Sequence, residues 1–350
     1  MISHDRLSAG EPGLFVGFDL GHGESCLVRV QAEGDDRPVP LKIDGSGRYS
    51  FPTALAKAKK DDAVSSENPG EEDITWLIGQ AAVSSENPDE FEIGFKSMPT
   101  QSPSWPEDRP RLVKFARQCH AAAKKFLPSD ESTQRFIIGC PTGWSNKDIE
   151  IYTEALVEAG LPNPQVERES RAALIQARDS KLIPREKLNG SIVVIDLGSS
   201  TTDVTHVSGL EVKKVFDVKD GHRLGASLID QFLFDEIMRD PSKSDWNDYF
   251  RDNRADRNVA LFNCRLLKEK YFSSTLDRRA KGVAEILPFA KGDLILKVTQ
   301  PLMDRALNTP LEALGNLSWI AAYRKVLEEL RSQGLRTTFS GPTHHFSLRF

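Results

Sequence analysis

The sequence has few of the residues that mark membrane, secreted or metal-binding proteins. Its 350 residues include four cysteines, at positions 26, 119, 140 and 264, and no two of them form a Cys-x-x-Cys pair. Neither a zinc site nor a disulfide framework is therefore indicated. No apolar run approaches the length needed to span a membrane, and the first residues lack the apolar core of a signal peptide. We expect a cytoplasmic protein with no membrane partner.

An excess of basic residues is also missing. The formal net charge is −5, which argues against sequence-independent nucleic-acid binding as the main role. The signatures of P-loop, Rossmann, zincin and serine-hydrolase proteins are absent. The chain is 39% hydrophobic and 28% charged, as in globular proteins, and its length favours two domains that each bury a core.

One stretch carries the clearest chemical signal. Residues 191–205 read Ser-Ile-Val-Val-Ile-Asp-Leu-Gly-Ser-Ser-Thr-Thr-Asp-Val-Thr. A continuous apolar run such as Ile192 to Ile195 predicts a strand covered on both faces, and it ends at Asp196. A turn of small residues follows, and a second strand is predicted through Val207. Backbone N–H groups of such a turn can surround phosphate oxygens, while the acid holds Mg²⁺ directly or through water.

The same pattern occurs near the start of the chain. Residues 14–30 again run from an apolar strand through Asp-Leu-Gly and a small turn into an alternating strand. One copy alone is more typical of a plain hairpin. Two copies, one in each half, predict two related lobes that face a shared phosphate group.

The remaining pattern alternates strands and helices. A proline-rich linker is predicted at residues 99–110, and Ser145-Asn-Lys-Asp148 is a capping pattern for a helix that Gly160 ends. Other helices are predicted over residues 112–126, 169–177, 227–238, 254–271 and 310–330, and strands over 91–96, 135–141, 212–218, 283–289 and 293–299.

These motifs together resemble a known family. The two Asp-Leu-Gly hairpins, with Gly139-Cys-Pro-Thr142, Glu169-Ser-Arg-Ala-Ala173 and Arg223-Leu-Gly-Ala226 in this order, resemble the nucleotide-binding domain of Hsp70 chaperones. That domain belongs to the actin/hexokinase/Hsp70 ATPase superfamily, and the resemblance covers about residues 13–330. It implies an α/β, actin-like ATPase fold with two ribonuclease-H-like lobes around a nucleotide cleft.

The resemblance also implies domain boundaries. We expect a flexible tail at 1–12, lobe I at 13–190, lobe II at 191–335 and an irregular or truncated tail at 336–350. Thr337 to Thr343 stand where the family has a glycine-rich adenosine motif. The chain is therefore expected to be truncated at its C-terminal end relative to the family.

Roles of individual residues follow from the same resemblance. Asp19 and Asp196 match the two acids around Mg²⁺ and its waters. Lys96 matches the catalytic lysine, Glu169 the glutamate that positions the attacking water, and Asp203 an acid that helps to activate it. Asp196 is counted with these three as catalytic. Residues expected to bind the nucleotide are Asp19, Gly21, His22, Gly23, Gly198, Ser199, Ser200, Thr201, Gly225 and Lys268.

Some of these residues also have a simpler interpretation. Glu169 could merely complement a helix N-terminus, where acids are favoured. Lys96 could be an ordinary exposed lysine at the end of a strand, and His22 a turn residue. His22 and Gly23 stand where the chaperones carry threonines, and Arg265 and Glu269 reverse the charges that the family has in its adenine region.

The function implied by the resemblance is that of an Hsp70-like ATP-binding protein. It would be a slow Mg²⁺-dependent ATPase, converting ATP to ADP and phosphate, and would act as a conformational switch with a co-chaperone or client protein as partner. Two alternatives remain: a catalytically degenerate nucleotide-binding or scaffold protein, and an actin-like filament-forming ATPase.

Overall fold

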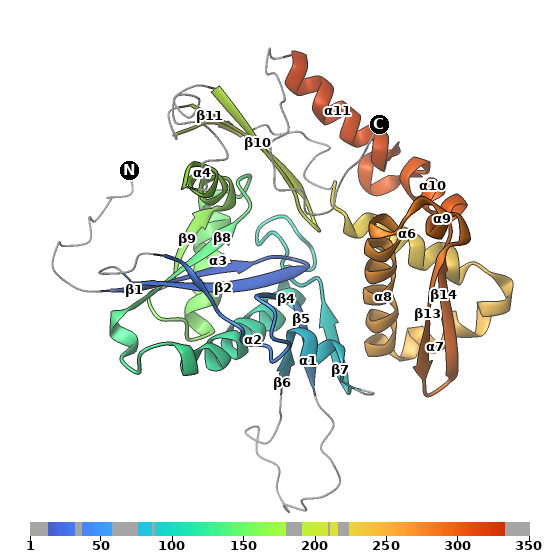
Figure 1. Ribbon diagram of the computed structural model, residues 1–350, viewed down its shortest axis with the longest axis horizontal. Helices are drawn as coiled ribbons and strands as arrows, with labels where there is room; N and C mark the ends of the chain where they lie inside the picture. Colours follow the sequence, from blue (N-terminus) through green and yellow to red (C-terminus); the bar gives the residue numbers. More distant parts are fainter. Residues whose placement is uncertain are drawn as a thin grey trace, which may run out of the picture.

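The computed structural model describes residues 13–31, 37–57, 76–85, 88–179, 191–208, 211–215 and 224–332. The predicted tails, residues 1–12 and 336–350, lie outside these ranges, as does Arg223. The chain has the expected mixed α/β architecture, with sheets and flanking helices in both halves (Figure 1). Of the two large hydrophobic cores, one is built within residues 14–161 and the other within 204–330.

The first half is organised around a six-stranded sheet of order β3-β2-β1-β8-β9, with β4 also paired to β2. The strands are β1 (Leu14–Leu20), β2 (Glu24–Gln31), β3 (Val39–Pro40), β4 (Ser50–Pro52), β8 (Gln134–Cys140) and β9 (Gln165–Arg168). β1 and β2 form the predicted antiparallel hairpin, whereas β1, β8 and β9 run parallel. The loops that follow these three parallel strands therefore meet at one edge of the sheet.

Two helices supply apolar side chains to the same core as this sheet. They are α2 (Trp105–Ala123) and α3 (Asn146–Glu158), and they contribute residues such as Phe115 and Tyr152 to it. The predicted start of α3 is confirmed: Ser145 and Asp148 form a reciprocal capping box, and Gly160 follows the helix with a φ of 79°. Short 3₁₀ turns at Lys124–Phe126 and Glu131–Thr133 lead from α2 into β8.

The prediction of a linker over residues 99–110 is wrong for its second half, because α2 already begins at Trp105. Pro106 falls in the first turn, where a missing N–H costs nothing since that group would have no helical acceptor. Pro110 lies inside the helix. Pro110 has no N–H to donate to the carbonyl of Pro106, four residues earlier, so one helical hydrogen bond is not made. Burial of the helix face outweighs this loss.

The second half contains the second hairpin and a helical region. β10 (Ser191–Leu197), β11 (Thr202–Ser208) and β12 (Glu211–Val215) form an antiparallel sheet. The helices are α6 (Ser227–Met238), α7 (Ser244–Asp252), α8 (Arg254–Ser273), α9 (Leu276–Lys281), α10 (Gln300–Asn308) and α11 (Trp319–Ser332). A 3₁₀ turn at Pro241–Lys243 precedes α7, and the predicted hairpin is present as β13 (Val283–Phe289) and β14 (Gly292–Val298).

Two predictions for this half need correction. The helix expected over 310–330 begins only at Trp319, because β15 (Pro310–Leu311), a 3₁₀ turn (Glu312–Leu314) and β16 (Leu317–Ser318) precede it. β10 is not covered on both faces: Ile192 to Ile195 are only partly buried, and Leu197 is 45% exposed. Within the described residues β10 pairs with β11 alone, whereas β1 has a strand on each side.

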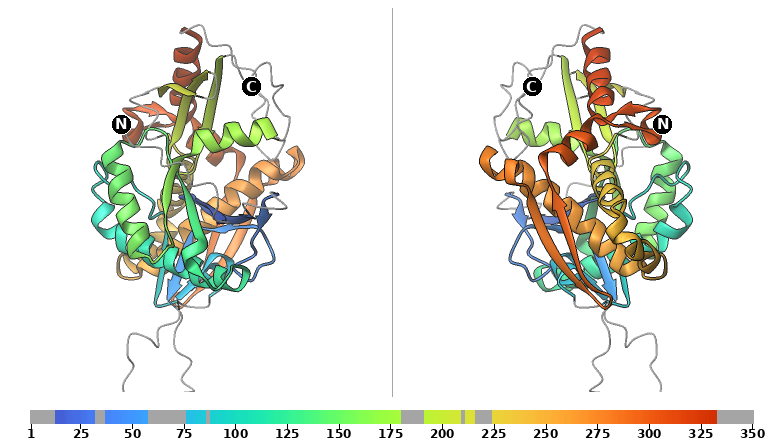
Figure 2. Two further views of the ribbon diagram at one scale, coloured as in Figure 1. Left: turned by 90° about the vertical axis from the view of Figure 1, so that its left-hand side faces the viewer. Right: turned by 90° about the vertical axis from the view of Figure 1, so that its right-hand side faces the viewer.

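A smaller sheet joins the two halves. β5 (Ala54–Lys57), β6 (Trp76–Ile78) and β7 (Glu90–Ile93) lie beside α1 (Gly79–Val83) in the first half, and β7 contacts α8 of the second. Phe91 and Phe262 meet edge to face there, with their ring centroids 6.3 Å apart. At the opposite end, β10 and β11 lie on the same side of the molecule as α4 (Glu169–Asp179) and α11 (Figures 1 and 2). No helix in the described ranges is long and apolar enough to cross a membrane.

Candidate functional site

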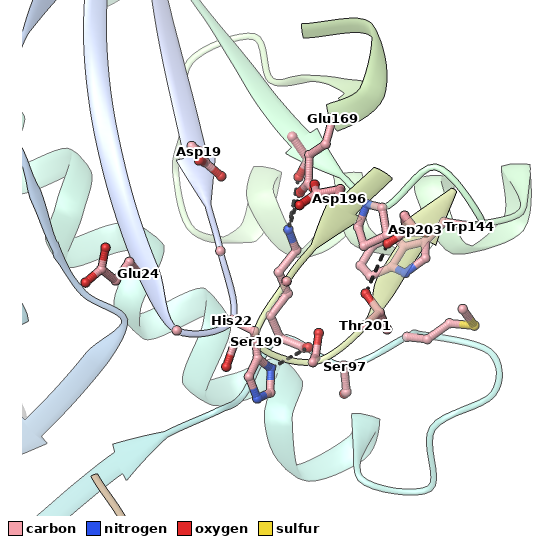
Figure 3. A pocket seen from close by; sticks show the side chains of 18 of the residues that line it. Asp19, His22, Glu24, Ser97, Trp144, Glu169, Asp196, Ser199, Thr201 and Asp203 are labelled. Carbon is pink, nitrogen blue, oxygen red and sulfur yellow. Dashed lines mark hydrogen bonds and ion pairs between the residues drawn. The ribbon is translucent and has the colours of Figure 1, made fainter. Parts of the chain in front are cut away.

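The turns of the two hairpins line one cavity of about 1380 Å³, which we call the cleft. Its walls come from both halves of the chain (Figure 3). All of the predicted site residues line the cleft except Gly225 and Lys268. They meet because the loop after β1, the loop after β8 and the first residue of α4 share one sheet edge, and the turn after β10 faces them.

The two turns need residues with little side-chain bulk. A Cβ atom on Gly21 would lie 2.3 Å from the carbonyl oxygen of Glu24, so a side chain has no space there. In the second turn, the N–H of Gly198 donates to the carbonyl of Thr201 at 2.8 Å. The N–H of Ser227, at the start of α6, donates to the carbonyl of Ser199 at 2.8 Å. The second turn is thereby fixed to the helix that follows it.

Gly225 supports the second turn from behind. A Cβ atom on this residue would lie 2.4 Å from backbone atoms of Ser199 and Ser200. Its carbonyl oxygen accepts a hydrogen bond from Nε1 of Trp319, at 3.1 Å. Gly225 therefore packs against the turn and does not line the cleft.

Lys96 and Glu169 form the central ion pair of the cleft. Lys96 Nζ lies 2.9 Å from Glu169 Oε1 and also donates to the carbonyl of Gly139 at 3.3 Å. The lysine side chain is only 4% exposed, so the interpretation as an exposed strand-end lysine is wrong. Burial alone would lower the pKa of Lys96, but the charge of Glu169 raises it above its ordinary value. A fixed ammonium therefore faces the cleft.

The carboxylates around this pair repel one another. Burial raises the pKa of Asp19, and Lys96 opposes this shift. Burial, with the charges of Glu169, Asp203 and Asp19, raises the pKa of Asp196 to about 6. Such a concentration of acids favours a bound cation. Among the described residues no three acidic, His or Cys side chains converge as a ready set of metal ligands.

Asp203 connects the two halves. It is 9% exposed, and its Oδ2 accepts a hydrogen bond from the hydroxyl of Thr201 at 3.0 Å. Its other oxygen lies 3.4 Å from the N–H of Gly143, in the loop after β8. The second hairpin is thus hydrogen-bonded to the first half next to the cleft.

His22 holds the first turn against the segment that carries Lys96. Its Nδ1 lies 3.1 Å from the carbonyl oxygen of Lys96, the geometry for donation by an Nδ1–H tautomer. Its Nε2 lies 3.0 Å from the place of a Cβ on Gly94. Burial lowers the pKa of His22, so the imidazole is neutral at neutral pH. The contact fits the turn-residue interpretation and adds a positioning role.

Arg265 also lines the cleft, although it was not among the predicted site residues. From α8 it donates through Nη1 to the carbonyl of Gly23 at 2.6 Å and pairs with Glu24 at 3.2 Å and Glu269 at 2.9 Å. A Cβ on Gly23 would lie 2.5 Å from this guanidinium nitrogen. The reversed charges at 265 and 269 were the sequence signal for this contact.

Lys268 lies away from the cleft. Its Nζ is 2.7 Å from Asp230 Oδ1 and donates to the carbonyl of Ala226 at 3.1 Å. The two charged side chains are only 4% and 6% exposed. Lys268 therefore joins α8 to α6 and is not among the residues that line the cleft.

Sequence reasoning missed part of the cleft wall. Met98, Gln101, Ser102 and Trp144 also line it, and Gln101 and Ser102 belong to the segment that was predicted as a linker. The Trp144 ring lies 5.9 Å from Lys96 Nζ, within the range of a cation–π contact. The position of Trp144, just after the Gly139-Cys-Pro-Thr142 motif, was the available signal.

A scan of the sequence against protein-family models finds no match, and a search of curated proteins also finds none. The function is therefore inferred from the motifs and from the geometry of the cleft.

Proposed function

We propose that this chain is an Hsp70-like ATP-binding protein with an actin-like fold, which hydrolyses ATP slowly and uses closure of its two halves as a switch. The main support for this proposal is that both Asp-Leu-Gly turns and the Lys96–Glu169 pair line one cleft. The strand order β3-β2-β1-β8-β9, with its antiparallel hairpin and two parallel neighbours, supports the fold proposal.

The chemistry divides between the two turns and the charged side chains. Backbone N–H groups of the small turns suit phosphate oxygens. Asp19 and Asp196 would hold Mg²⁺, which when bound offsets the phosphate charge. The buried ammonium of Lys96 supplies a second, fixed positive charge. Glu169 keeps Lys96 in place and, with Asp203, offers acceptor oxygens that can orient a water molecule.

One observation favours the second candidate, a nucleotide-binding scaffold without turnover. Lys268 forms a buried ion pair with Asp230, and Arg265 donates a hydrogen bond to the carbonyl of Gly23 in the first turn. Two positions of the helix that the family uses for adenosine are thus engaged in contacts within the protein. Fewer side chains are then left to contact adenosine, as expected of a degenerate nucleotide-binding or scaffold protein.

Thermal unfolding with and without Mg-ATP tests the proposal. Ligand at about 100 times its dissociation constant adds about 2.7 kcal/mol to stability, which raises the midpoint by a few degrees. We expect this shift for the wild type and its loss in Asp196→Ala. Asp293→Ala, which removes an exposed acid from the start of β14, is the matched control and is expected to keep the shift.

The ligand-induced shift is compared within each variant, because removal of Asp196 also relieves repulsion in the free protein. A well-folded wild type that shows no shift would refute nucleotide binding at the cleft. If the shift is present, phosphate release under single-turnover conditions separates the ATPase from the scaffold.

A further inference from the structure

A second cavity, of about 450 Å³, lies apart from the cleft between α6, α7 and α8. Its lining residues are Phe234, Asn247, Phe250, Arg251, Arg254, Arg257 and Asn258. Three of these side chains carry a positive charge, and no carboxylate lines the cavity. The volume is within the range of small-molecule sites. We call it the arginine cavity.

Arg257 is the central cation of this cavity. Its guanidinium carbon lies 5.1 Å from the centroid of the Phe234 ring, so the planar group rests on an aromatic floor. Within the part of the chain that the structure describes, Arg257 has no ion-pair partner. The guanidinium of Arg257 is therefore oriented by packing but not neutralised by a carboxylate, which leaves it available to bind an anion.

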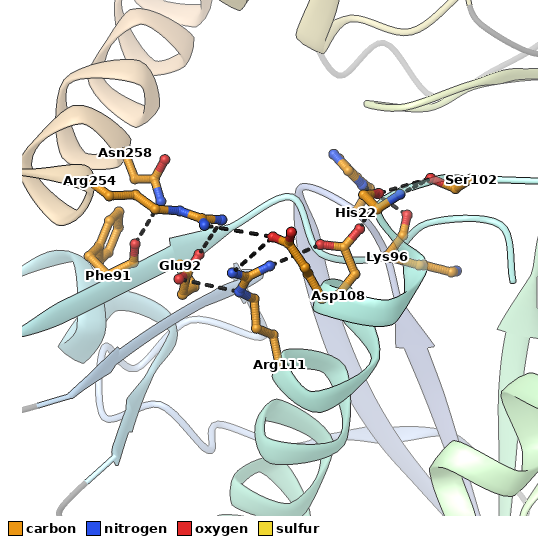
Figure 4. A network of polar contacts seen from close by, with 11 residues as sticks. His22, Phe91, Glu92, Lys96, Ser102, Asp108, Arg111, Arg254 and Asn258 are labelled. Carbon is orange, nitrogen blue, oxygen red and sulfur yellow. Dashed lines mark hydrogen bonds and ion pairs between the residues drawn. The ribbon is translucent and has the colours of Figure 1, made fainter. Parts of the chain in front are cut away.

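The other two arginines have only weak partners. Arg251 pairs with Asp248 at 2.6 Å, and both side chains are about three-quarters exposed, at 73% and 74%. Arg254, which is 58% exposed, lies 3.5 Å from Glu92 (Figure 4). It also lies 3.8 Å from Glu107. Exposed pairs contribute little, because water and salt screen them. A ligand with more than one negative charge can therefore compete for both guanidinium groups.

The rest of the cavity is rigid and already desolvated. Phe234 and Phe250 are each 4% exposed and form its apolar floor. Asn258 is 7% exposed, and its Nδ2 donates to the carbonyl of Phe91 at 2.8 Å, which fixes the side chain (Figure 4). The break at Asn253 between α7 and α8 sets Arg251 apart from Arg254 and Arg257, so the three groups approach one space from two helices.

We propose that the arginine cavity binds a small phosphorylated anion carrying at least two negative charges. Guanidinium forks match phosphate oxygens in paired hydrogen bonds, and three of them would offset such a charge. The apolar floor lowers the local dielectric beside Arg257, which is less exposed than the other two arginines, and strengthens its contact with the anion. This cavity is separate from the cleft, and the walls of the two share no residue.

Calorimetric titration with inorganic pyrophosphate tests the proposal. The full chain is used at low salt with EDTA, so that the acid-rich cleft has no divalent cation. We expect one site in the wild type and a loss of affinity of about tenfold or more in Arg257→Gln. Arg251→Gln, which changes an exposed side chain and leaves folding intact, is expected to weaken binding several-fold.

Two controls locate the probe. Arg278→Gln removes an exposed arginine from α9 and changes the net charge by the same amount as Arg257→Gln. This variant should bind pyrophosphate as the wild type does. Lys96→Met removes the cation of the cleft and should also leave binding unchanged. The proposal is overturned if folded wild type does not bind, if Arg257→Gln and Arg251→Gln bind normally, if Arg278→Gln loses as much affinity, or if Lys96→Met abolishes binding.

Discussion

At the scale of single residues, Asp196 is a cleft carboxylate whose pKa is strongly raised by its surroundings. Burial and three neighbouring acids raise its pKa to about 6, above the ordinary value of 3.8. The native protein then binds this proton more tightly than the unfolded chain does. The resulting stabilisation is complete below about pH 4 and is lost as the pH rises through about 6.

Asp196→Asn should therefore stabilise the protein at pH 7, because asparagine stays neutral. The gain is at most about 3 kcal/mol, from a shift of roughly two pKa units. It should shrink toward zero as the pH falls below the ordinary value of 3.8, where the wild-type carboxyl becomes protonated in both states. Urea unfolding at a series of pH values measures this, and a difference that does not change with pH would contradict the assigned cause.

The Lys268–Asp230 pair is the second residue-scale case. Lys268→Met leaves Asp230 buried without its partner, which should cost roughly 3–5 kcal/mol of stability. The double variant Lys268→Met with Asp230→Leu should recover most of this loss, because no unpaired charge remains. Lys270→Met is the control on the same helix, since its partner Glu285 is about half exposed and the pair is worth about 1 kcal/mol or less. Equal losses at 268 and 270 would show that the buried pair has no special role.

At the scale of elements, the second turn depends on its junction with α6. Gly225→Ala places a Cβ within 2.4 Å of the turn's backbone, and backbone cannot yield as a flexible side chain does. We expect the turn to move and the Mg-ATP-induced thermal shift to fall by at least half, while circular dichroism stays native. Gly13→Ala is a fair control, because its Cβ would meet Thr133 at an ordinary 3.7 Å. Full retention of the shift in Gly225→Ala would mean that the turn does not bind phosphate.

At the scale of the whole molecule, β7 and α8 join the two halves at one side of the cleft. Glu92 on β7 is bridged by Arg111 of α2 at 3.2 Å and Arg254 of α8 at 3.5 Å (Figure 4). Burial raises the pKa of Glu92, and the arginines counter this. Beside this polar bridge, Phe262 packs on Phe91. Under the proposed closure of the two halves, opening of the cleft would have to separate both contacts.

Phe262→Ala should therefore weaken closure and speed the release of bound nucleotide by roughly tenfold, the effect of losing about 1.4 kcal/mol of contact energy. Stopped-flow release of a fluorescent ATP analogue measures the rate. Leu276→Ala on α9, where the side chain is 80% exposed, should leave the rate unchanged. An unaltered rate in Phe262→Ala would place the barrier to release elsewhere.

Much of the local structure followed from the sequence. The hairpins, the helix capped by Ser145 and the helix at Arg254–Ser273 were predicted from apolar periodicity and capping residues, which act over a few neighbouring positions. The same signals failed at Trp105, where prolines suggested a linker, because tolerance of proline depends on its place in the first turn and on burial of the helix.

The sequence by itself determined which residues have the chemistry for a phosphate and cation site, since two copies of one short motif are visible without coordinates. Only the tertiary structure decided which of these residues share a cleft. Lys268 and Arg265 lie three residues apart on one helix. Lys268 nevertheless pairs with the buried Asp230, whereas Arg265 donates a hydrogen bond to the first turn. The partner of a charged side chain comes from distant parts of the chain, and packing, not local spacing, selects it.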